Sequence, residues 1–208
     1  MNLEYYYWYF KSAIPPKICD EIIKYGLEQQ DQLALTGKFK SDEDLSEEQL
    51  KELSKKRKSN VVWMNDNWIY KEIHPYIRQA NVNAGWNFDW DFSESCQFTK
   101  YKEGEFYDWH CDSWNKPYDL PDDKNRHGKI RKLSVTVCLS DETEYEGGDF
   151  EFDFRNQDDG SNRPQICTEI RPKGSVVVFP SFLWHRVNPV TSGTRHSLVI
   201  WNLGRPFR

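Results

Sequence analysis

The second half of the chain is a succession of short strand-forming runs, and this pattern limits the fold more than any other feature. Apolar residues occupy every second position in 86–92 and again in 150–154, which predicts half-buried strands. Runs rich in β-branched residues predict three more strands, at 133–139, 176–179 and 197–201. Glycines mark the turns between these runs: Gly104, Gly147, Gly148, Gly174 and Gly193. Many short strands at this spacing predict a β-sandwich or a barrel, a group that includes the jelly rolls.

The first third of the chain carries helical signals instead. Isoleucines at helical spacing follow a pair of prolines, which predicts a helix at 17–30. Ser46 and Gln49 have the spacing of a capping box and predict the start of a second helix. A third helix is expected at 66–81. The N-terminal part is therefore predicted to support the β-rich part that follows it.

The composition is that of a globular domain rather than a disordered or membrane-embedded chain. Hydrophobic residues make up 38% of the 208 residues and charged residues 29%. No run reaches the roughly 18 apolar residues of a membrane span. We expect a single domain over residues 1–208, with a helical N-terminal support at 1–84 and a β core at 85–208. Two polar stretches, 116–129 and 155–165, predict loops.

Charge and cysteine content limit the partners and the compartment. A net charge of -5 tells against non-specific binding of nucleic acid, which needs a basic surface. The start of the chain contains Glu4 and lacks a basic segment, so it does not have the pattern of a signal peptide. The five cysteines are widely spaced and never form a CxxC pair, which disfavours a disulfide framework and a structural zinc site. We expect a cytoplasmic protein without nucleic-acid or membrane partners; the oligomeric state is not encoded in any pattern.

A possible metal-binding pair lies in the segment 106–112, which has the pattern of a strand. His110 and Asp112 are two residues apart, so in an extended chain both side chains point to the same face. Cys111 then points to the other face and is expected in the core. An HxD pair alone is a weak signal, because a surface histidine beside a surface aspartate has the same pattern.

A second histidine strengthens this interpretation. His185 follows the strand predicted at 176–179, and turn residues lie between it and Arg195. We expect a hairpin that places His185 and Arg195 on adjacent strands, with Ser197 on the same face as Arg195. Two imidazoles and one carboxylate form the facial triad of non-haem Fe(II) oxygenases. An arginine with a hydroxyl two residues later offers a forked set of donors for a carboxylate.

These motifs resemble those of the Fe(II)- and 2-oxoglutarate-dependent dioxygenases, specifically the prolyl 4-hydroxylase-like branch and its bacterial PKHD-type hydroxylases. The resemblance extends from about Asn60 to Gly204. It is carried, in chain order, by Gln97-Phe98-Thr99-Lys100-Tyr101, Tyr107-Asp108-Trp109-His110-Cys111-Asp112, Arg131-Lys132-Leu133-Ser134, Leu139-Ser140 with Glu146-Gly147-Gly148, and His185 with Arg195. The spacing of ten residues between His185 and Arg195 is the most specific of these features.

The resemblance implies a mainly β (α+β) fold, a double-stranded β-helix of the jelly-roll or cupin-like type with flanking helices. It implies that the metal ligands are His110, Asp112 and His185. It also implies a set of residues for the cosubstrate: Arg195 for the distal carboxylate of 2-oxoglutarate, helped by Tyr101 and Ser197, with Trp201 as a wall of the pocket. For Trp201, ordinary packing is an equal alternative. The other histidines, His74, His127 and His196, are expected to lie outside the site.

The activity implied is hydroxylation of a C–H bond with release of succinate and CO2, using Fe(II), 2-oxoglutarate and O2, with ascorbate as a candidate reductant. A prolyl residue of a protein or peptide is the first choice of substrate, as in a procollagen-proline-type 4-hydroxylase. One departure weakens that choice: collagen-type enzymes carry lysine where this chain has Arg195, and arginine is the PKHD-type residue. Either residue binds a carboxylate.

Four other interpretations remain open. The enzyme could hydroxylate a free small molecule, and nucleobase demethylation is a third enzymatic interpretation, disfavoured by the acidic balance of charge. A cupin-like protein that binds metal without oxidising anything is an alternative from another class. A lectin-like or purely structural jelly roll is the last. The presence of Arg195 favours an enzyme, because a simple metal-binding protein has no use for a carboxylate-binding arginine.

Overall fold

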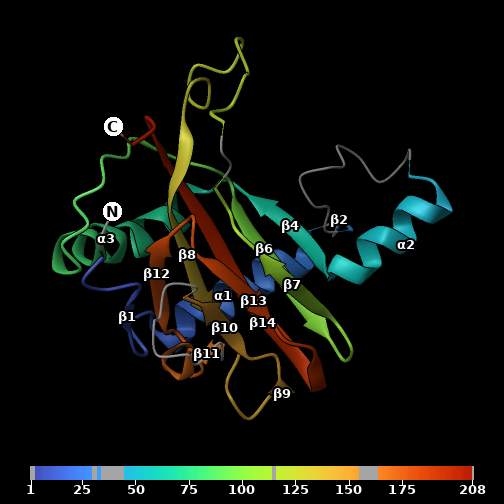
Figure 1. Ribbon diagram of the computed structural model, residues 1–208. Coiled ribbons are helices and arrows are strands. Elements are labelled where there is room, and N and C mark those ends of the chain that lie inside the picture. Colours follow the sequence, from blue (N-terminus) through green and yellow to red (C-terminus); the bar gives the residue numbers. More distant parts are fainter. Residues whose placement is uncertain (1–2, 30–31, 34–44, 114–115, 155–163, 208) are drawn as a thin grey trace.

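The computed structural model describes residues 3–29, 32–33, 45–113, 116–154 and 164–207, and its strands form two antiparallel sheets (Figure 1). The larger sheet has nine strands, seven of them in the order β1-β12-β8-β14-β6-β4-β2, while β5 and β9 pair with β14. Its strands are β1 (Trp8–Phe10), β2 (Gln32–Leu33), β4 (Asn60–Met64), β5 (Phe92–Ser93), β6 (Cys96–Lys102), β8 (Ile130–Cys138), β9 (Tyr145–Gly147), β12 (Val176–Pro180) and β14 (Val190–Gly204).

The smaller sheet has five strands in the order β11-β10-β13-β7-β3. They are β3 (Arg57–Lys58), β7 (Phe106–His110), β10 (Phe150–Asp153), β11 (Gln165–Ile166) and β13 (Trp184–Val187). The chain passes between the sheets at several points, for example from β3 to β4 and from β13 to β14. Two facing antiparallel sheets with such crossings form the expected double-stranded β-helix.

All three α-helices of the described chain lie in the first 84 residues: α1 (Pro16–Glu28), α2 (Glu47–Lys56) and α3 (Asn67–Asn83). A short 3-10 helix, η1 (Thr168–Ile170), precedes β12. The predicted capping box is present, because Ser46 Oγ accepts from the Gln49 amide and the Gln49 side chain accepts from the Ser46 amide. None of these helices is long and apolar enough to cross a membrane.

Two helices cover the outer face of the larger sheet with apolar side chains. Ile22 of α1 and Ile73 of α3 are fully buried and belong to the same core cluster as Leu198 and Ile200 of β14. Helix α2 differs, because it buries only Leu53 and extends away from the sheets (Figure 1). The same first 84 residues also contribute strands to both sheets, which places part of the predicted helical support within the β core.

The predicted strand at 86–92 is wrong, although its alternation of buried and exposed residues is correct. Trp86 and Phe88 are buried, but only Phe92 belongs to a strand. Asn87 has a φ of 49°, which a strand does not allow. The Asn81 side chain bonds both the amide and the carbonyl of Phe88, and thereby replaces a neighbouring strand.

The two predicted polar loops have different outcomes. Residues 116–129 form turns without helix or strand, as expected, and the loop is closed by two backbone hydrogen bonds, from the Tyr118 amide to the Lys129 carbonyl and from the Gly128 amide to the Tyr118 carbonyl. Of the stretch 155–165, residues 155–163 lie outside the described part of the chain, and Gln165 begins β11. All five cysteines are free thiols.

Candidate active site

Two neighbouring strands of the smaller sheet bring His110, Asp112 and His185 together. His110 ends β7 and faces His185 of β13 in register, and Asp112 follows two residues after β7. His110 Nε2 lies 3.8 Å from one carboxylate oxygen of Asp112, and His185 Nε2 lies 3.5 Å from the other. The three ligand atoms lie within 4.8 Å of one another, so one metal ion can contact all three.

The predicted hairpin between His185 and Arg195 is wrong. Strand β13 pairs with β10 and β7 in the smaller sheet, whereas β14 pairs with β6, β8 and β9 in the larger one. The two residues therefore lie on opposite sheets. Both are buried, at 5% and 1% exposed, because each belongs to an inner face of the double-stranded β-helix.

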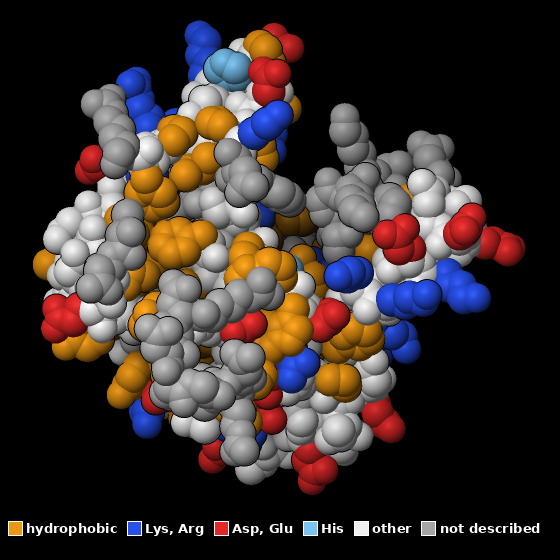
Figure 2. Space-filling view, viewed as in Figure 1, with side chains coloured by type: hydrophobic (Ala, Val, Ile, Leu, Met, Phe, Trp, Pro, Cys, Tyr) orange, Lys and Arg blue, Asp and Glu red, His pale blue; other side chains and the backbone are white. Residues whose placement is uncertain are grey.

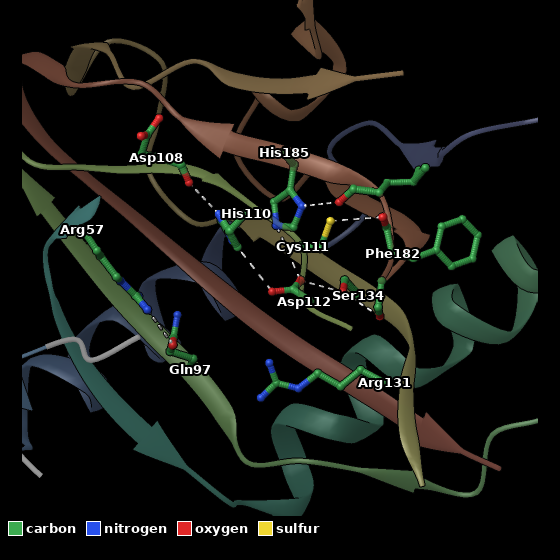
Figure 3. A network of polar contacts seen from close by, with 12 residues as sticks. Arg57, Gln97, Asp108, His110, Cys111, Asp112, Arg131, Ser134, Phe182 and His185 are labelled. Carbon is green, nitrogen blue, oxygen red and sulfur yellow. Dashed lines mark hydrogen bonds and ion pairs between the residues drawn. The ribbon is translucent and has the colours of Figure 1, made fainter. Parts of the chain in front are cut away.

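Backbone carbonyls orient both imidazoles of the cluster (Figure 3). His110 Nδ1 lies 2.8 Å from the carbonyl oxygen of Asp108, and His185 Nδ1 lies 2.9 Å from that of Leu183. A carbonyl oxygen only accepts, so each Nδ1 carries the proton and each Nε2 keeps its lone pair. Burial, together with the neighbouring His185, holds the pKa of His110 well below its usual value. Neutral imidazoles with free Nε2 atoms are the form that binds a metal.

Asp112 is held as a carboxylate despite its burial. Burial alone would raise its pKa, but the two histidines, Arg131 and a hydrogen bond from Ser134 together lower it. Ser134 Oγ donates to one carboxylate oxygen over 2.7 Å and lies 2.8 Å from Ser181 Oγ. The amide of Asp112 donates to the Ser181 carbonyl. Strand β8 and the residue after β12 thus fix the carboxylate from the larger sheet.

Arg195 is the largest fully buried side chain of the described chain, and neither Nη1 nor Nη2 has a hydrogen-bond partner. It faces Tyr101 across β14 and β6, with its Cζ 5.7 Å from the centre of the Tyr101 ring. Ser197 is buried two residues along the same strand. Gly148 makes room for the arginine: it has a φ of 60°, and an added Cβ would lie 3.0 Å from Arg195 Cδ.

Trp201 is buried on the same face of β14 as Arg195, and its Nε1 also lacks a partner. It pairs in register with Ser134, the residue that bonds Asp112. The guanidinium of Arg131 lies 3.8 Å from the centre of its ring and is paired with Glu94 at 2.6 Å. Trp201 therefore lies at the metal end of the interior rather than in the helix-facing core.

Two residues near the site were missed by the sequence analysis. Tyr145 lies beside Arg195 and Cys138, and burial raises its pKa to about 12. It comes two residues before Gly147 and could have been found by extending that motif by one residue. Arg57, buried beside Gln97 and Tyr107, carries no sequence signal, since it follows a run of lysines at a helix end.

The remaining histidines lie outside the cluster, as predicted. His74 belongs to α3 and bonds Ser93, His127 lies in the loop 116–129, and His196 stacks on Phe98 on the outer face of β14. The prediction for Cys111 is wrong in one respect. Its side chain does turn away from the cluster, with Sγ 3.2 Å from the Phe182 carbonyl, but the residue is partly exposed rather than in the core.

The family model described as the 2OG-Fe(II) oxygenase superfamily matches residues 96–202, just over half of the chain. The protein belongs to this superfamily. The family implies Fe(II) and 2-oxoglutarate, and the residues present fit both groups. The cluster offers two nitrogens and a carboxylate to one ion, and the two unpartnered nitrogens of Arg195 match a buried carboxylate.

Curated relatives are PKHD-type hydroxylases. One from Synechococcus sp. strain CC9902 is 35% identical over 108 residues, covering 51% of this chain and 40% of that protein. YbiX of Escherichia coli O157:H7 is 32% identical over 105 residues, covering 50% of this chain and 40% of YbiX. The matched stretch therefore spans about two fifths of the length of these relatives.

Solved structures with the same fold cover nearly the whole chain. A viral collagen prolyl hydroxylase from Paramecium Bursaria Chlorella virus-1 superposes with a TM-score of 0.63 at 20% identity, covering 97% of each chain. A prolyl hydroxylase from Trichoplax adhaerens, solved with a hypoxia inducible factor peptide fragment, has a TM-score of 0.67 at 14% identity and covers 95% of this chain and 83% of that chain. At these identities the likeness shows the fold alone.

Proposed function

We propose that the protein is an Fe(II)- and 2-oxoglutarate-dependent dioxygenase that hydroxylates a C–H bond of its substrate and releases succinate and CO2. In this proposal His110, Asp112 and His185 hold the iron, and Arg195 binds the distal carboxylate of 2-oxoglutarate. The observation that carries the proposal is the buried guanidinium of Arg195, whose Nη1 and Nη2 have no hydrogen-bond partner, between the same two sheets as a three-residue metal cluster. A protein that only binds metal has no need of this buried charge, whose desolvation is unfavourable unless an anion is bound.

The bound iron, together with 2-oxoglutarate and O2, supplies the oxidation, and the protein supplies binding and orientation. The Nδ1 hydrogen bonds of His110 and His185 keep both Nε2 lone pairs directed at the ion. Ser134 keeps one oxygen of Asp112 engaged and leaves the other for coordination. Tyr101, Ser197 and Tyr145 surround Arg195 and keep water away from the carboxylate it binds.

The substrate belongs to the same proposal. A prolyl residue of a protein or peptide is our first choice, supported by the prolyl hydroxylases among the structures of the same fold. In this proposal such a substrate approaches through the hollow that Figure 2 shows between the main body and the part that carries α2, which has hydrophobic side chains on the main-body side. Ascorbate as reductant and a cytoplasmic location, which suits five free thiols, complete the proposal.

Removal of a metal ligand tests this function most directly. His110→Ala and Asp112→Ala should each lower succinate formation from 2-oxoglutarate at least about a thousandfold, because several kcal/mol of metal-based stabilisation are lost. The matched control is His127→Ala, which removes a histidine from the exposed loop and should leave turnover unchanged. Succinate is measured with Fe(II) and proline-containing peptides, and mass spectrometry detects the added oxygen. Substantial turnover by either ligand variant would refute the assignment.

The same protein distinguishes an enzyme from a cupin-like binding protein. Fe(II) and 2-oxoglutarate together should raise the melting temperature more than the sum of their separate effects, because both bind the folded state at adjoining places. Independent effects and no succinate would favour the binding protein.

A further inference from the structure

Arg57 is a buried cation that none of the described acidic groups neutralises. It is 4% exposed, and Nε donates to Ser59 Oγ over 3.0 Å. Nη1 donates to Gln97 Oε1 over 3.4 Å, and the guanidinium lies 4.4 Å from the centre of the Tyr107 ring. These three partners are neutral. Nη2 has no hydrogen-bond partner at all. A buried charge in this state is unfavourable until an anion reaches it.

Arg57 adjoins the metal cluster rather than a remote part of the fold. On β3 it pairs in register with Tyr107 of β7, and the Tyr107 ring stacks on His110 with 3.5 Å between ring centres. Its charge contributes to the low pKa of His110. Figure 3 shows the guanidinium end of Arg57 directed from its own sheet towards Gln97 of the larger sheet. Arg57 thus spans the two sheets at one side of the cluster.

The buried side-chain atoms that lack hydrogen-bond partners are all of one chemical type. In the described part of the chain, the buried side-chain nitrogen and oxygen atoms without partners are Arg57 Nη2, Arg195 Nη1 and Nη2, and Trp201 Nε1. All four are N–H donors, so the interior as a whole requires acceptors. The cosubstrate carboxylate accounts for Arg195. It leaves the donors of Arg57 and Trp201 for a second ligand.

The balance of charge points to an anionic second ligand. Fe(II) and doubly charged 2-oxoglutarate cancel, Asp112 offsets Arg195, and Arg131 is paired with Glu94. The positive charge of Arg57 is left over. A substrate that brings one negative charge next to Arg57 would make the loaded site neutral, and burial of a neutral set of charges is the less costly arrangement.

An apolar wall lies beside Arg57 at the surface. Trp63 of β4 pairs in register with Gln97, the residue that Arg57 contacts, and its ring centre is 6.1 Å from that of Trp201. Trp63 is 49% exposed, whereas Trp201 is buried. An exposed indole therefore lies on the strand position next to Gln97, which Arg57 contacts, and this combination suits a ligand with an apolar ring and an acidic group.

We propose that Arg57 binds a carboxylate of the substrate itself, so that the enzyme prefers substrates with a carboxylate close to the carbon that is hydroxylated. The inference rests on the proposed function and deepens it. Two sources supply this chemistry: the α-carboxylate of a free amino acid such as proline, and the side chain of an acidic residue next to a prolyl residue in a peptide. In both, Trp63 contacts the apolar part and Arg57 offers a forked donor to the carboxylate.

Matched acid and amide probes test the preference without turnover. Quenching of tryptophan fluorescence, to which Trp63 and Trp201 contribute, is followed in the absence of O2 with Fe(II) and 2-oxoglutarate bound. The probes are L-proline against L-prolinamide, and the peptides Ala-Glu-Pro-Ala and Ala-Asp-Pro-Ala against their Gln and Asn counterparts. At least one acid should bind about tenfold to a hundredfold more tightly than its amide, the range for a charged hydrogen bond. Equal binding within every pair overturns the inference, and the pair that differs identifies the source.

Variants of β3 assign the preference to Arg57. Arg57→Gln should remove the preference for acids over amides, because binding of the acid probe weakens about tenfold or more while binding of the amide probe is unaffected. Arg57→Lys should keep part of this preference. Lys58→Gln is the matched control, because it removes the same charge from the exposed neighbouring position and should keep the full preference. A preference that survives Arg57→Gln, or a loss that falls on 2-oxoglutarate affinity instead, overturns the inference. If Arg57→Gln does not fold, the Arg57→Lys ratio decides, since lysine lacks the planar fork.

Failure of the inference and failure of the proposed function give different results. Binding preference is measured without oxidation, so an acid preference that depends on Arg57 in a protein that forms no succinate would refute the proposed function alone. Succinate formation with no acid preference would refute the role of Arg57 alone.

Discussion

Strand β14 buries its two faces against different surroundings. Leu198 and Ile200 point to the helices and pack among the isoleucines of α1 and α3. Arg195 and Trp201 point to the interior, equally buried, with donors that have no partner in the described chain. The first face contributes apolar burial to folding, and the second holds buried donors without partners, where the proposed function places a ligand. Burial alone therefore does not distinguish a structural residue from a functional one; the state of its hydrogen bonds does.

The largest effect is expected on the helix-facing side. Ile200→Ala should lower the free energy of unfolding by about 3 kcal/mol, because it leaves a cavity among fully buried neighbours. The affinity for 2-oxoglutarate should hardly change in the protein that remains folded. Chemical denaturation measures the first quantity and ligand titration the second. A large loss of affinity with little loss of stability would contradict the division between the two faces.

The opposite result is expected five residues earlier on the same strand. Arg195→Met should weaken 2-oxoglutarate binding by roughly a hundredfold, because a bidentate charged contact is removed. The ligand-free protein should unfold at the same or a higher denaturant concentration, since a buried unpaired charge is replaced by an apolar side chain. Isothermal titration calorimetry measures the affinity for 2-oxoglutarate, and denaturation of the ligand-free protein measures its stability. A marked drop in stability would show that Arg195 has a structural partner.

A smaller effect is expected at Ser134, which connects the larger sheet to the metal cluster. Ser134→Ala removes the hydroxyl that donates to Asp112 and should weaken Fe(II) binding about tenfold. This donor helps to lower the pKa of Asp112, so its loss raises that pKa. Because only the carboxylate binds metal, Fe(II) binding should then be lost at a higher pH as the solution is acidified. Metal titration between pH 4 and 7 tests the shift, with Ser54→Ala on the exposed face of α2 as the control.

The local part of this architecture could be predicted from the sequence. The strand runs, the capping box at Ser46 and the common face of His110 and Asp112 depend on residues a few positions apart. The pairing partners of β13 and β14 depend on contacts across the chain, and nothing between His185 and Arg195 records that the chain changes sheets there. The predicted hairpin failed for that reason. The strand predicted at 86–92 failed because Asn81, a residue outside the run, satisfies the backbone that a strand would pair.

The part of the site that could be predicted consists of residue types with a typical role, such as the histidine and aspartate ligands of metals. Two histidines and an aspartate at these spacings suit a metal, and the structure brings all three together. Arg57 was not predictable, because it follows two lysines at the end of an exposed helix and its burial results from the turn of the chain into β3 and β4. Tyr145 differs from Arg57, because extending the Glu146-Gly147-Gly148 motif by one residue would have included it, although only the fold places it beside Arg195.

The carbonyls of Asp108 and Leu183 fix the orientation of the His110 and His185 rings, with Nδ1 as the donor, as soon as the strands have formed. The side-chain entropy of these rings is therefore lost during folding, and its loss does not reduce the free energy of metal binding. Under the proposed function, loading and release of iron would then be an exchange with solvent rather than a rearrangement of the chain.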